Sequence, residues 1–243
     1  MQQPEVSLQT SSVESISAKK SITNVYDIIN SLDNQKQELV KSIGFGGLLY
    51  FPCIKQLNRK FSIWLMSRVD ALKKQMSVHE GISISLHKDD VNKVFGVPCS
   101  GLKVTGSVLP NQKTIELIST EYLSVQLSSA RRVKTVQQII EKKYDSEMSQ
   151  QEKVAFKTAF VIYIMSTLLA PGAKFDYVSV EFWNALADPD RIGCYDWSEY
   201  ILDKLLDSCM KVRADLNAGR KPPGLTGCAF FLQVNVKLNI SLP

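Results

Sequence analysis

Apolar residues recur every three or four positions through most of the chain, which is the spacing of one face of an α-helix. Two of these stretches begin with a capping pattern, because Ser149 is followed by Glu152 and Asp196 by Glu199. A last apolar segment follows at 225–234. The helices that the pattern predicts cover 21–43, 57–72, 88–95, 132–144, 150–169 and 197–218.

One stretch has the period of a strand instead. Residues 82–86 alternate between apolar and polar side chains, and Val78 is placed to begin a partner strand across Glu80 and Gly81. Residues 99–113 contain turn-forming glycine and proline and predict a loop. The fold class predicted from these patterns is mainly α, a single helical domain with a small β-hairpin element.

The domain organisation follows from length and local composition. The 243 residues suit one domain. Residues 1–20 are rich in Ser and Gln and contain no aromatic residue, so we predict a disordered tail. The helical domain is expected over 21–234, followed by a divergent C-terminal tail over 235–243. The N-terminus has no apolar signal-peptide core, so we expect an intracellular protein.

Composition adds limits on the class of protein. Hydrophobic residues make up 44% of the chain, enough for a sizeable core. The five cysteines show no C-x-x-C spacing, which predicts reduced and mostly buried thiols and no structural zinc site. The apolar stretch 154–170 contains Lys157 and is shorter than a bilayer span, so it predicts a buried core helix and no membrane partner.

The sequence offers little catalytic chemistry. Its two histidines, His79 and His87, flank the predicted hairpin and are expected at the surface. The glycines at 44–47 lack the strand and the spacing of a dinucleotide-binding loop. The acidic pairs Asp89-Asp90 and Asp188-Pro189-Asp190 fit a helix start and a turn. We therefore predict a protein that is not an enzyme, with no cofactor, metal site or small-molecule substrate.

Positive charge is concentrated in the first part of the chain. The net charge is +5, but residues 1–143 carry 19 basic and 12 acidic residues, a net +7. This asymmetry is consistent with a nucleic-acid partner. It is also consistent with an ordinary solvated surface, because the basic residues are scattered along the chain. Trp64, Trp183 and Trp197 lie in apolar contexts and are expected in the core. The candidate nucleic-acid contacts are Lys55, Arg59, Lys60, Arg131, Arg132 and Lys134.

Residues 82–101 resemble the strand-then-helix signature of plant mobile domain proteins, which are transposon-related and include copies labelled aminotransferase-like. The matching positions are Asp90, Val91, Gly96, Pro98 and Gly101. The resemblance covers about residues 40–234 and implies a nuclear protein linked to genome stability and silencing. It carries no catalytic residues and implies no pyridoxal phosphate chemistry. No Ulp1-type protease domain follows in this chain.

These observations leave several functions open. We expect a non-enzymatic module that binds a protein partner and does not contact a membrane. Its expected location is the nucleus. A nucleic-acid-binding module is the first alternative. A truncated gene fragment is the second, because the family pattern is not continued after Val234. A residual transferase or hydrolase is the third.

Overall fold

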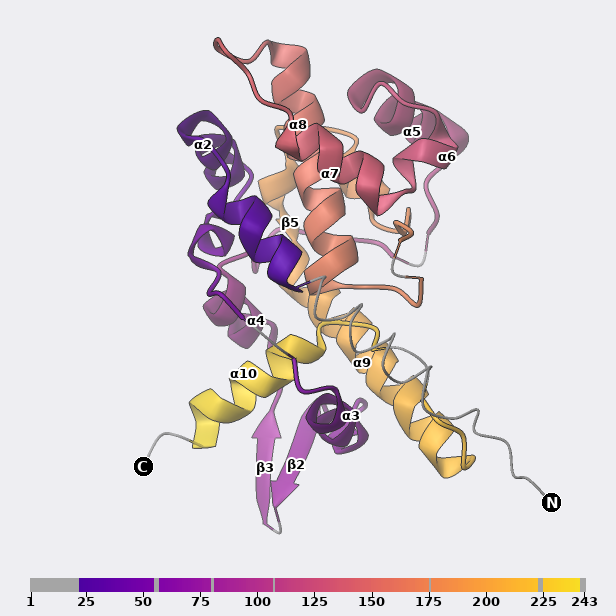
Figure 1. Cartoon of the computed structure of the whole chain (residues 1–243). Coiled ribbons are helices and arrows are strands. Elements are labelled where there is room, and N and C mark those ends of the chain that lie inside the picture. The colour runs from indigo at the N-terminus through magenta and orange to yellow at the C-terminus, as the bar shows by residue number, and fades with distance from the viewer. Residues whose placement is uncertain are drawn as a thin grey trace, which may run out of the picture.

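The computed structural model describes residues 22–54, 57–79, 81–106, 108–174, 176–222 and 225–240. These residues are mainly helical, which confirms the predicted fold class (Figure 1). The predicted tail over 1–20 lies outside them. The helices are one over 22–30, α2 (Asn34–Ser42), α3 (Arg59–Ser67), α4 (Lys88–Phe95), α5 (Gln112–Glu116), α6 (Leu127–Ala130), α7 (Val133–Glu141), α8 (Gln150–Ile164), α9 (Trp197–Asn217) and α10 (Ala229–Ile240).

Shorter helical turns link or extend these helices. The 3₁₀ turns are η1 (Gly46–Tyr50), η4 (Trp183–Leu186) and η5 (Ile192–Cys194), and the π-helical turns are η2 (Leu117–Tyr122) and η3 (Met165–Leu169). The turn η3 continues α8, so the predicted helix over 150–169 is present as one helical stretch with a wider last turn.

The described strands form two small sheets. The predicted hairpin is confirmed as β2 (Gln75–His79) and β3 (Ile82–Ser85), and β1 (Val69–Asp70) adds a third antiparallel strand with Val69 opposite Met76. The second sheet is parallel and pairs β4 (Leu102–Lys103) with β5 (Tyr195–Asp196). The prediction of an unbroken loop over 99–113 is therefore wrong at β4. Its partner lies far along the chain, where no local pattern signals it.

The apolar stretch predicted as a core helix forms the centre of the molecule. Every residue of α8 from Phe156 to Ile164 is buried, including Lys157, which is 8% exposed. The Lys157 ammonium lies 2.6 Å from an Asp190 carboxylate oxygen, so the buried cation has a partner. Within the described residues, no helix is both long and apolar enough to cross a membrane.

The helices gather in two parts of the molecule. Figure 1 shows α2, α5, α6, α7 and α8 in the upper part, and α3, the β2–β3 hairpin and α10 in the lower part. The long helix α9 passes from one part to the other and packs against α3 and α4. Asp196 caps α9 as predicted, because its side chain accepts a hydrogen bond from Glu199 N at 2.9 Å.

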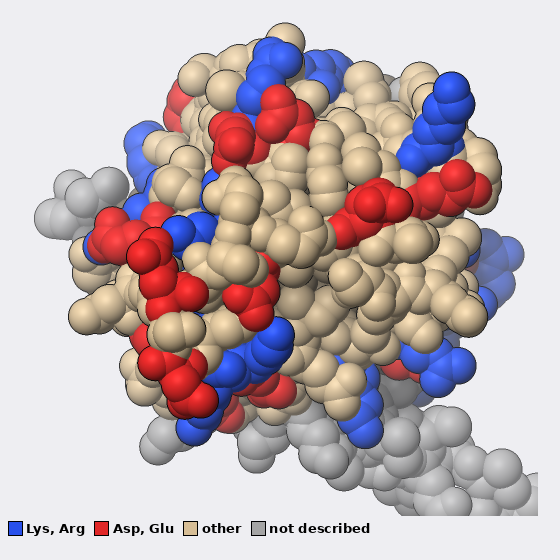
Figure 2. Space-filling model, turned by 90° about the horizontal axis from the view of Figure 1, so that it is seen from above, with Lys and Arg blue, Asp and Glu red and all other residues tan. Residues whose placement is uncertain are grey.

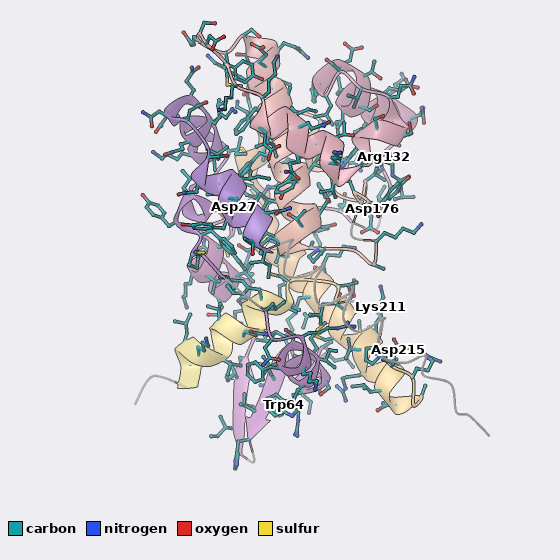
Figure 3. All side chains as sticks on the ribbon, viewed as in Figure 1. Asp27, Trp64, Arg132, Asp176, Lys211 and Asp215 are labelled. Carbon is teal, nitrogen blue, oxygen red and sulfur yellow. The ribbon has the colours of Figure 1, made fainter. Side chains whose placement is uncertain are left out.

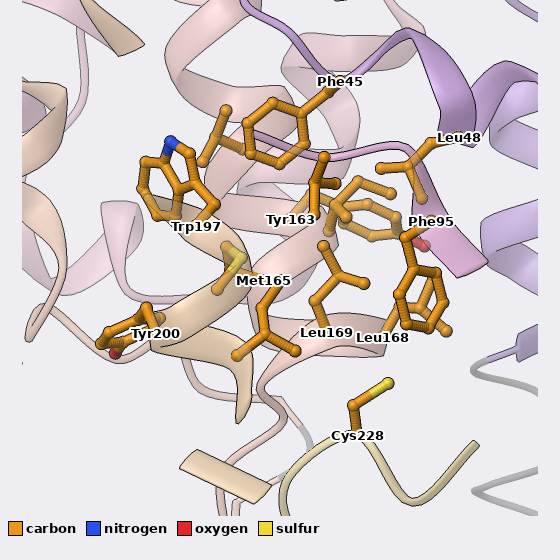
Figure 4. Packing of buried hydrophobic residues seen from close by; sticks show 14 of the residues in the cluster. Phe45, Leu48, Phe95, Tyr163, Met165, Leu168, Leu169, Trp197, Tyr200 and Cys228 are labelled. Atoms are coloured by element: carbon orange, nitrogen blue, oxygen red, sulfur yellow. The ribbon is translucent and has the colours of Figure 1, made fainter. Parts of the chain in front are cut away.

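Aromatic rings fill the core near the start of α9. Trp197 is fully buried and meets the ring of Phe45 edge-on, with centroids 5.6 Å apart (Figure 4). Its indole nitrogen donates to Ile192 O at 2.8 Å, so the buried polar atom is satisfied. Trp183 is also fully buried. The predicted core positions of these two tryptophans are confirmed.

Several element boundaries differ from the prediction, and the helix predicted over 132–144 is present as α7, which ends at Glu141. The helix predicted over 21–43 is interrupted at 31–33, where Asp33 caps α2 by accepting from Lys36 N at 3.0 Å. The helix predicted over 57–72 is shorter, because the chain turns into β1 after Arg68. At the other end of the chain, α10 continues past the predicted boundary at Val234.

Glycines at 44–47 and in the family signature lie where neighbouring atoms leave no room for a side chain. Gly96 ends α4 in the left-handed conformation, with φ of 59°, and its backbone lies against that of Gly47. A Cβ on Gly44 would come within 2.7 Å of Pro98 Cγ, and one on Gly101 would overlap the carbonyl oxygen of Cys194. These glycines are required by close approach of the backbone.

Candidate functional site

Helix α3 is held against the core along one side. Asn58 caps its start by accepting a hydrogen bond from Phe61 N at 3.0 Å. Ser62, Leu65 and Met66 are buried, and this side of the helix packs against α9 and α10. Gln233 on α10 donates to Ser62 Oγ at 2.7 Å. These contacts fix which side of α3 faces the core.

The opposite side of α3 presents an aromatic ring between two cations. Lys60, Trp64 and Arg68 follow one another at four-residue spacing, so they lie in one row along the helix. Trp64 is 38% exposed, and Lys60 and Arg68 are exposed as well. The Arg68 guanidinium lies 5.2 Å from the centre of the Trp64 ring, a cation–π contact.

Phe61 extends the aromatic part of this row. Its ring lies 5.9 Å from that of Trp64, with an angle of 13° between the two planes. Phe61 itself is half-buried, which limits the orientations open to Trp64. We call Lys60, Phe61, Trp64 and Arg68 the α3 surface. Figure 3 shows Trp64 in the lower part of the molecule, near the hairpin.

The prediction that Trp64 lies in the core is wrong. The buried positions of this segment are Ser62, Leu65, Met66 and Val69. The side of the helix that faces the core is therefore rotated by about one residue from the side that the apolar residues predicted. Leu72, the last residue of the predicted helix, lies in the turn after β1 and is 93% exposed.

Further positive charge lies close to α3 in the chain. Lys73 is exposed in the turn between β1 and β2, and Lys74 Nζ lies 4.0 Å from Asp203 on α9. Within the described residues, no acidic side chain forms an ion pair with Lys60, Arg68 or Lys73. These cations are therefore available to an anionic partner.

The predicted basic candidates do not form one site. Arg59 and Lys60 lie on α3, with Arg59 half-buried, whereas Lys55 is outside the described residues. The other three lie at the start of α7. Figure 3 places Arg132 in the upper part of the molecule, well away from Trp64. The end of the molecule opposite α3 carries charges of both signs interspersed (Figure 2).

The candidates at the start of α7 have different surroundings. The Arg131 guanidinium lies 4.3 Å from the centre of the Tyr177 ring and is half-buried. Its backbone carbonyl accepts from Val178 N at 2.9 Å, so this residue is part of the packing between two segments. Arg132 and Lys134 are exposed. Of the three, these two are placed to contact a partner.

The family-signature residues have structural roles. Val91 is fully buried, and Asp90 accepts a hydrogen bond from His87 N at 3.1 Å at the start of α4. Pro98 O accepts from Ser198 N at 2.9 Å. Together with the glycine contacts above, these bonds join α4 to η1 and α9. The signature residues therefore help to maintain the fold.

The cysteines and histidines differ in their surroundings. Cys99 Sγ donates to Asp89 Oδ1 at 3.2 Å, and burial together with this bond raises the pKa of the Cys99 thiol. Both histidines are exposed, as predicted, with His79 at the end of β2 and His87 at the start of α4. Burial raises the pKa of the Cys209 and Cys228 thiols to about 12, so both stay protonated at neutral pH. The expectation that most cysteines are buried is wrong, because Cys53 and Cys194 are exposed and Cys99 is half-buried.

The described residues also contain hollows in the surface. An apolar groove of about 300 Å³ lies between η1, α4 and α10, with Phe51, Phe95 and Phe230 in its lining. A cavity of about 310 Å³ with both apolar and charged residues in its lining lies beside α9, where Lys204 pairs with Glu181 at 2.5 Å. No three side chains of His, Cys, Asp or Glu gather as a metal site in the described part of the chain.

Comparison with known proteins gives a family and no activity. A family model described as "Domain of unknown function (DUF8566)" matches residues 18–233. No curated protein and no solved structure matches the chain.

Proposed function

The chain belongs to the family described as a domain of unknown function (DUF8566), and from its surfaces we propose that it is a non-enzymatic module that binds a polyanion. The observation that carries this proposal is the α3 surface, where an exposed tryptophan lies between two cations that have no acidic partner among the described residues. Trp and Arg are the side chains that contribute most often to binding energy at interfaces.

Charge favours a polyanion over a neutral partner. Lys60, Arg68 and Lys73 would each gain an electrostatic contact on binding, and such contacts release counterions from a polyanion. The exposed Arg132 and Lys134 belong to the start of α7, which lies in the other part of the molecule from α3 (Figure 1). We therefore assign the binding to the α3 surface.

A protein partner is the second candidate, and a different feature favours it. The apolar groove between η1, α4 and α10 is flanked by Tyr50, whose side chain is 85% exposed. Exposed aromatic side chains beside an apolar groove are typical of peptide-binding surfaces. Loss of partner binding on Tyr50→Ala, with the α3 surface intact, would support this candidate.

The resemblance to plant mobile domain proteins supports a nuclear location and a role in genome silencing, which we include in the proposal. A polyanion such as nucleic acid is consistent with that location. Localisation of the tagged full chain in plant cells would test this part directly, and exclusion from the nucleus would contradict it.

Heparin tests the polyanion proposal, because it carries dense negative charge and no aromatic base. We expect the Lys60→Gln/Arg68→Gln variant to elute from a heparin column at lower salt than the wild type. The matched control is Arg132→Gln/Lys134→Gln, which removes the same charge from the start of α7. If the control shifts and the α3 variant does not, the α3 surface is not the binding site.

A further inference from the structure

We propose that the partner of the α3 surface is single-stranded nucleic acid, with a base stacked on Trp64 and the neighbouring phosphates held by Lys60 and Arg68. This inference rests on the proposed function, because it specifies which polyanion binds. It gives the aromatic rings a role in binding, whereas binding through charge alone would need no aromatic ring.

The spacing of the row suits a short stretch of one strand. Residues four apart on a helix are separated by about 6 Å along its axis, so Lys60 and Arg68 are about 12 Å apart along α3. With about 3.4 Å per stacked nucleotide, this distance corresponds to about three or four nucleotides. A base at Trp64 would therefore have phosphates within reach of both cations.

The aromatic pair distinguishes a single strand from other polyanions. Base stacking on aromatic side chains needs an unpaired base with a free face, which a duplex hides within its own stack. Heparin and acidic protein segments would satisfy the cations and leave the indole without a planar partner. Arg68 also lies against the Trp64 ring, and guanidinium groups stack on bases as well.

The contact of Trp64 with Phe61 makes the surface ready for stacking. The two rings lie nearly parallel, and the half-buried Phe61 restricts the motion of its neighbour. A ring that is already restrained loses less conformational freedom on binding than a free one. The bases themselves need not be of one kind, since every base has a π-face, so we expect little sequence preference.

Trp64 also provides a direct signal of binding. The chain contains three tryptophans, and the other two, Trp183 and Trp197, are fully buried. Quenching of tryptophan fluorescence by an added oligonucleotide therefore reports on the α3 surface. Stacking on Trp64 should quench this emission, whereas phosphate contacts alone should leave it nearly unchanged.

The test uses the full chain with labelled fifteen-residue oligo(dT) and oligo(U), a duplex of equal length, and heparin. We expect both single strands to bind more tightly than the duplex and to quench the tryptophan emission. Tighter binding of oligo(dT) would identify DNA as the preferred ligand, and tighter binding of oligo(U) would identify RNA. Trp64→Ala should weaken single-strand binding about tenfold. Trp64→Phe should restore part of it, and heparin binding should be unchanged in both variants.

Two controls separate this inference from the proposed function. Tyr50→Ala removes an exposed aromatic ring that belongs to η1 and not to the α3 surface, and should have no effect. Lys60→Gln/Arg68→Gln should reduce the slope of log affinity against log salt by about 1.4, the value for two phosphate contacts on a single strand. Circular dichroism of each variant confirms that it is folded.

Three results would overturn the inference. Equal affinity for single strand, duplex and heparin, with no effect of Trp64→Ala, would leave the polyanion proposal intact and remove the role of stacking. Single-strand binding lost only in Arg132→Gln/Lys134→Gln would place the site at α7. Failure of every polyanion to bind the folded chain would overturn the proposed function together with this inference.

Discussion

Gly47 and Gly96 meet backbone to backbone, and a Cβ on Gly47 would lie 2.5 Å from Gly96 Cα. One glycine belongs to η1, and the other ends α4 within the family signature. Their contact brings η1 and α4 closer together than any larger residue would allow. Two motifs that are separate in the sequence are thus one packing feature in the structure.

The first prediction concerns this contact. Gly47→Ala should lower the free energy of unfolding by about 1–3 kcal/mol, because the new methyl group meets backbone atoms that cannot turn aside. Urea denaturation followed by circular dichroism measures the change. The matched control is Gly172→Ala, where a Cβ would meet nothing within 4 Å. Equal stability of the two variants would contradict the packing role of Gly47.

The second prediction concerns the buried lysine of α2. Lys36 is 4% exposed, and its Nζ donates to Ile140 O at 2.8 Å and Lys142 O at 2.6 Å. It therefore satisfies carbonyls at the C-terminal end of α7. Lys36→Met should destabilise the protein by about 1–3 kcal/mol, since these carbonyls lose their donor.

The control for Lys36 is Lys41→Met on the same helix. Lys41 is exposed and pairs with the exposed Glu38, so its loss should change stability by less than about 0.5 kcal/mol. Thermal and urea denaturation of both variants check the difference. A Lys36→Met protein as stable as the wild type would show that the α7 carbonyls do not depend on this ammonium.

The third prediction is a pH dependence at the start of α8. Hydrogen bonds from Lys142 and Ser149 lower the pKa of Glu152 from 4.5 to about 2. Because the folded pKa is the lower one, this carboxylate stabilises the fold above pH 4.5, and the contribution is lost as the pH falls toward 2. Glu152→Gln should therefore show a weaker loss of stability over that range.

Lys142→Met provides an independent check of the same interaction. It removes the donor that contributes most to the shift, so the acid-induced loss of stability due to Glu152 should be smaller than in the wild type and should be complete at a higher pH. Urea denaturation from pH 2 to pH 6 measures both variants. A wild type and a Glu152→Gln variant with parallel pH profiles would contradict the assignment.

The fourth prediction concerns thiol reactivity. Cys53 and Cys194 are exposed and should react with a thiol reagent at pH 8 in the folded protein. Cys209 and Cys228 are buried, with a pKa of about 12, and should react only after denaturation. Peptide mass analysis of the labelled protein locates the modified cysteines. Rapid labelling of Cys228 in the native state would show that its surroundings open readily.

The sequence predicted local features well. The capping patterns at Ser149 and Asp196 are confirmed, because each involves residues three apart on one turn of helix. The hairpin at 75–85 is confirmed for the same reason, since adjacent strands pair across a short turn. Such features depend on neighbouring residues, and their pattern is complete within a few positions.

Features set by distant segments were missed. Trp64 was expected in the core, and its exposure depends on which side of α3 the helices α9 and α10 cover. Four-residue spacing of Lys60, Trp64 and Arg68 was the one signal in the sequence for the α3 surface. The exposure of Cys53 and Cys194 likewise depends on tertiary packing, which composition does not report.

The parallel pair of β4 and β5 has a consequence for the order of folding. Leu102 pairs with Tyr195, so two residue pairs close a loop of about 90 residues. The entropy cost of closing such a loop exceeds the stabilisation that so short a ladder provides. The ladder is therefore stable only after α7 and α8 have packed within the loop. We therefore expect the ladder to form late, and its amide hydrogens to exchange with solvent sooner than those of α8.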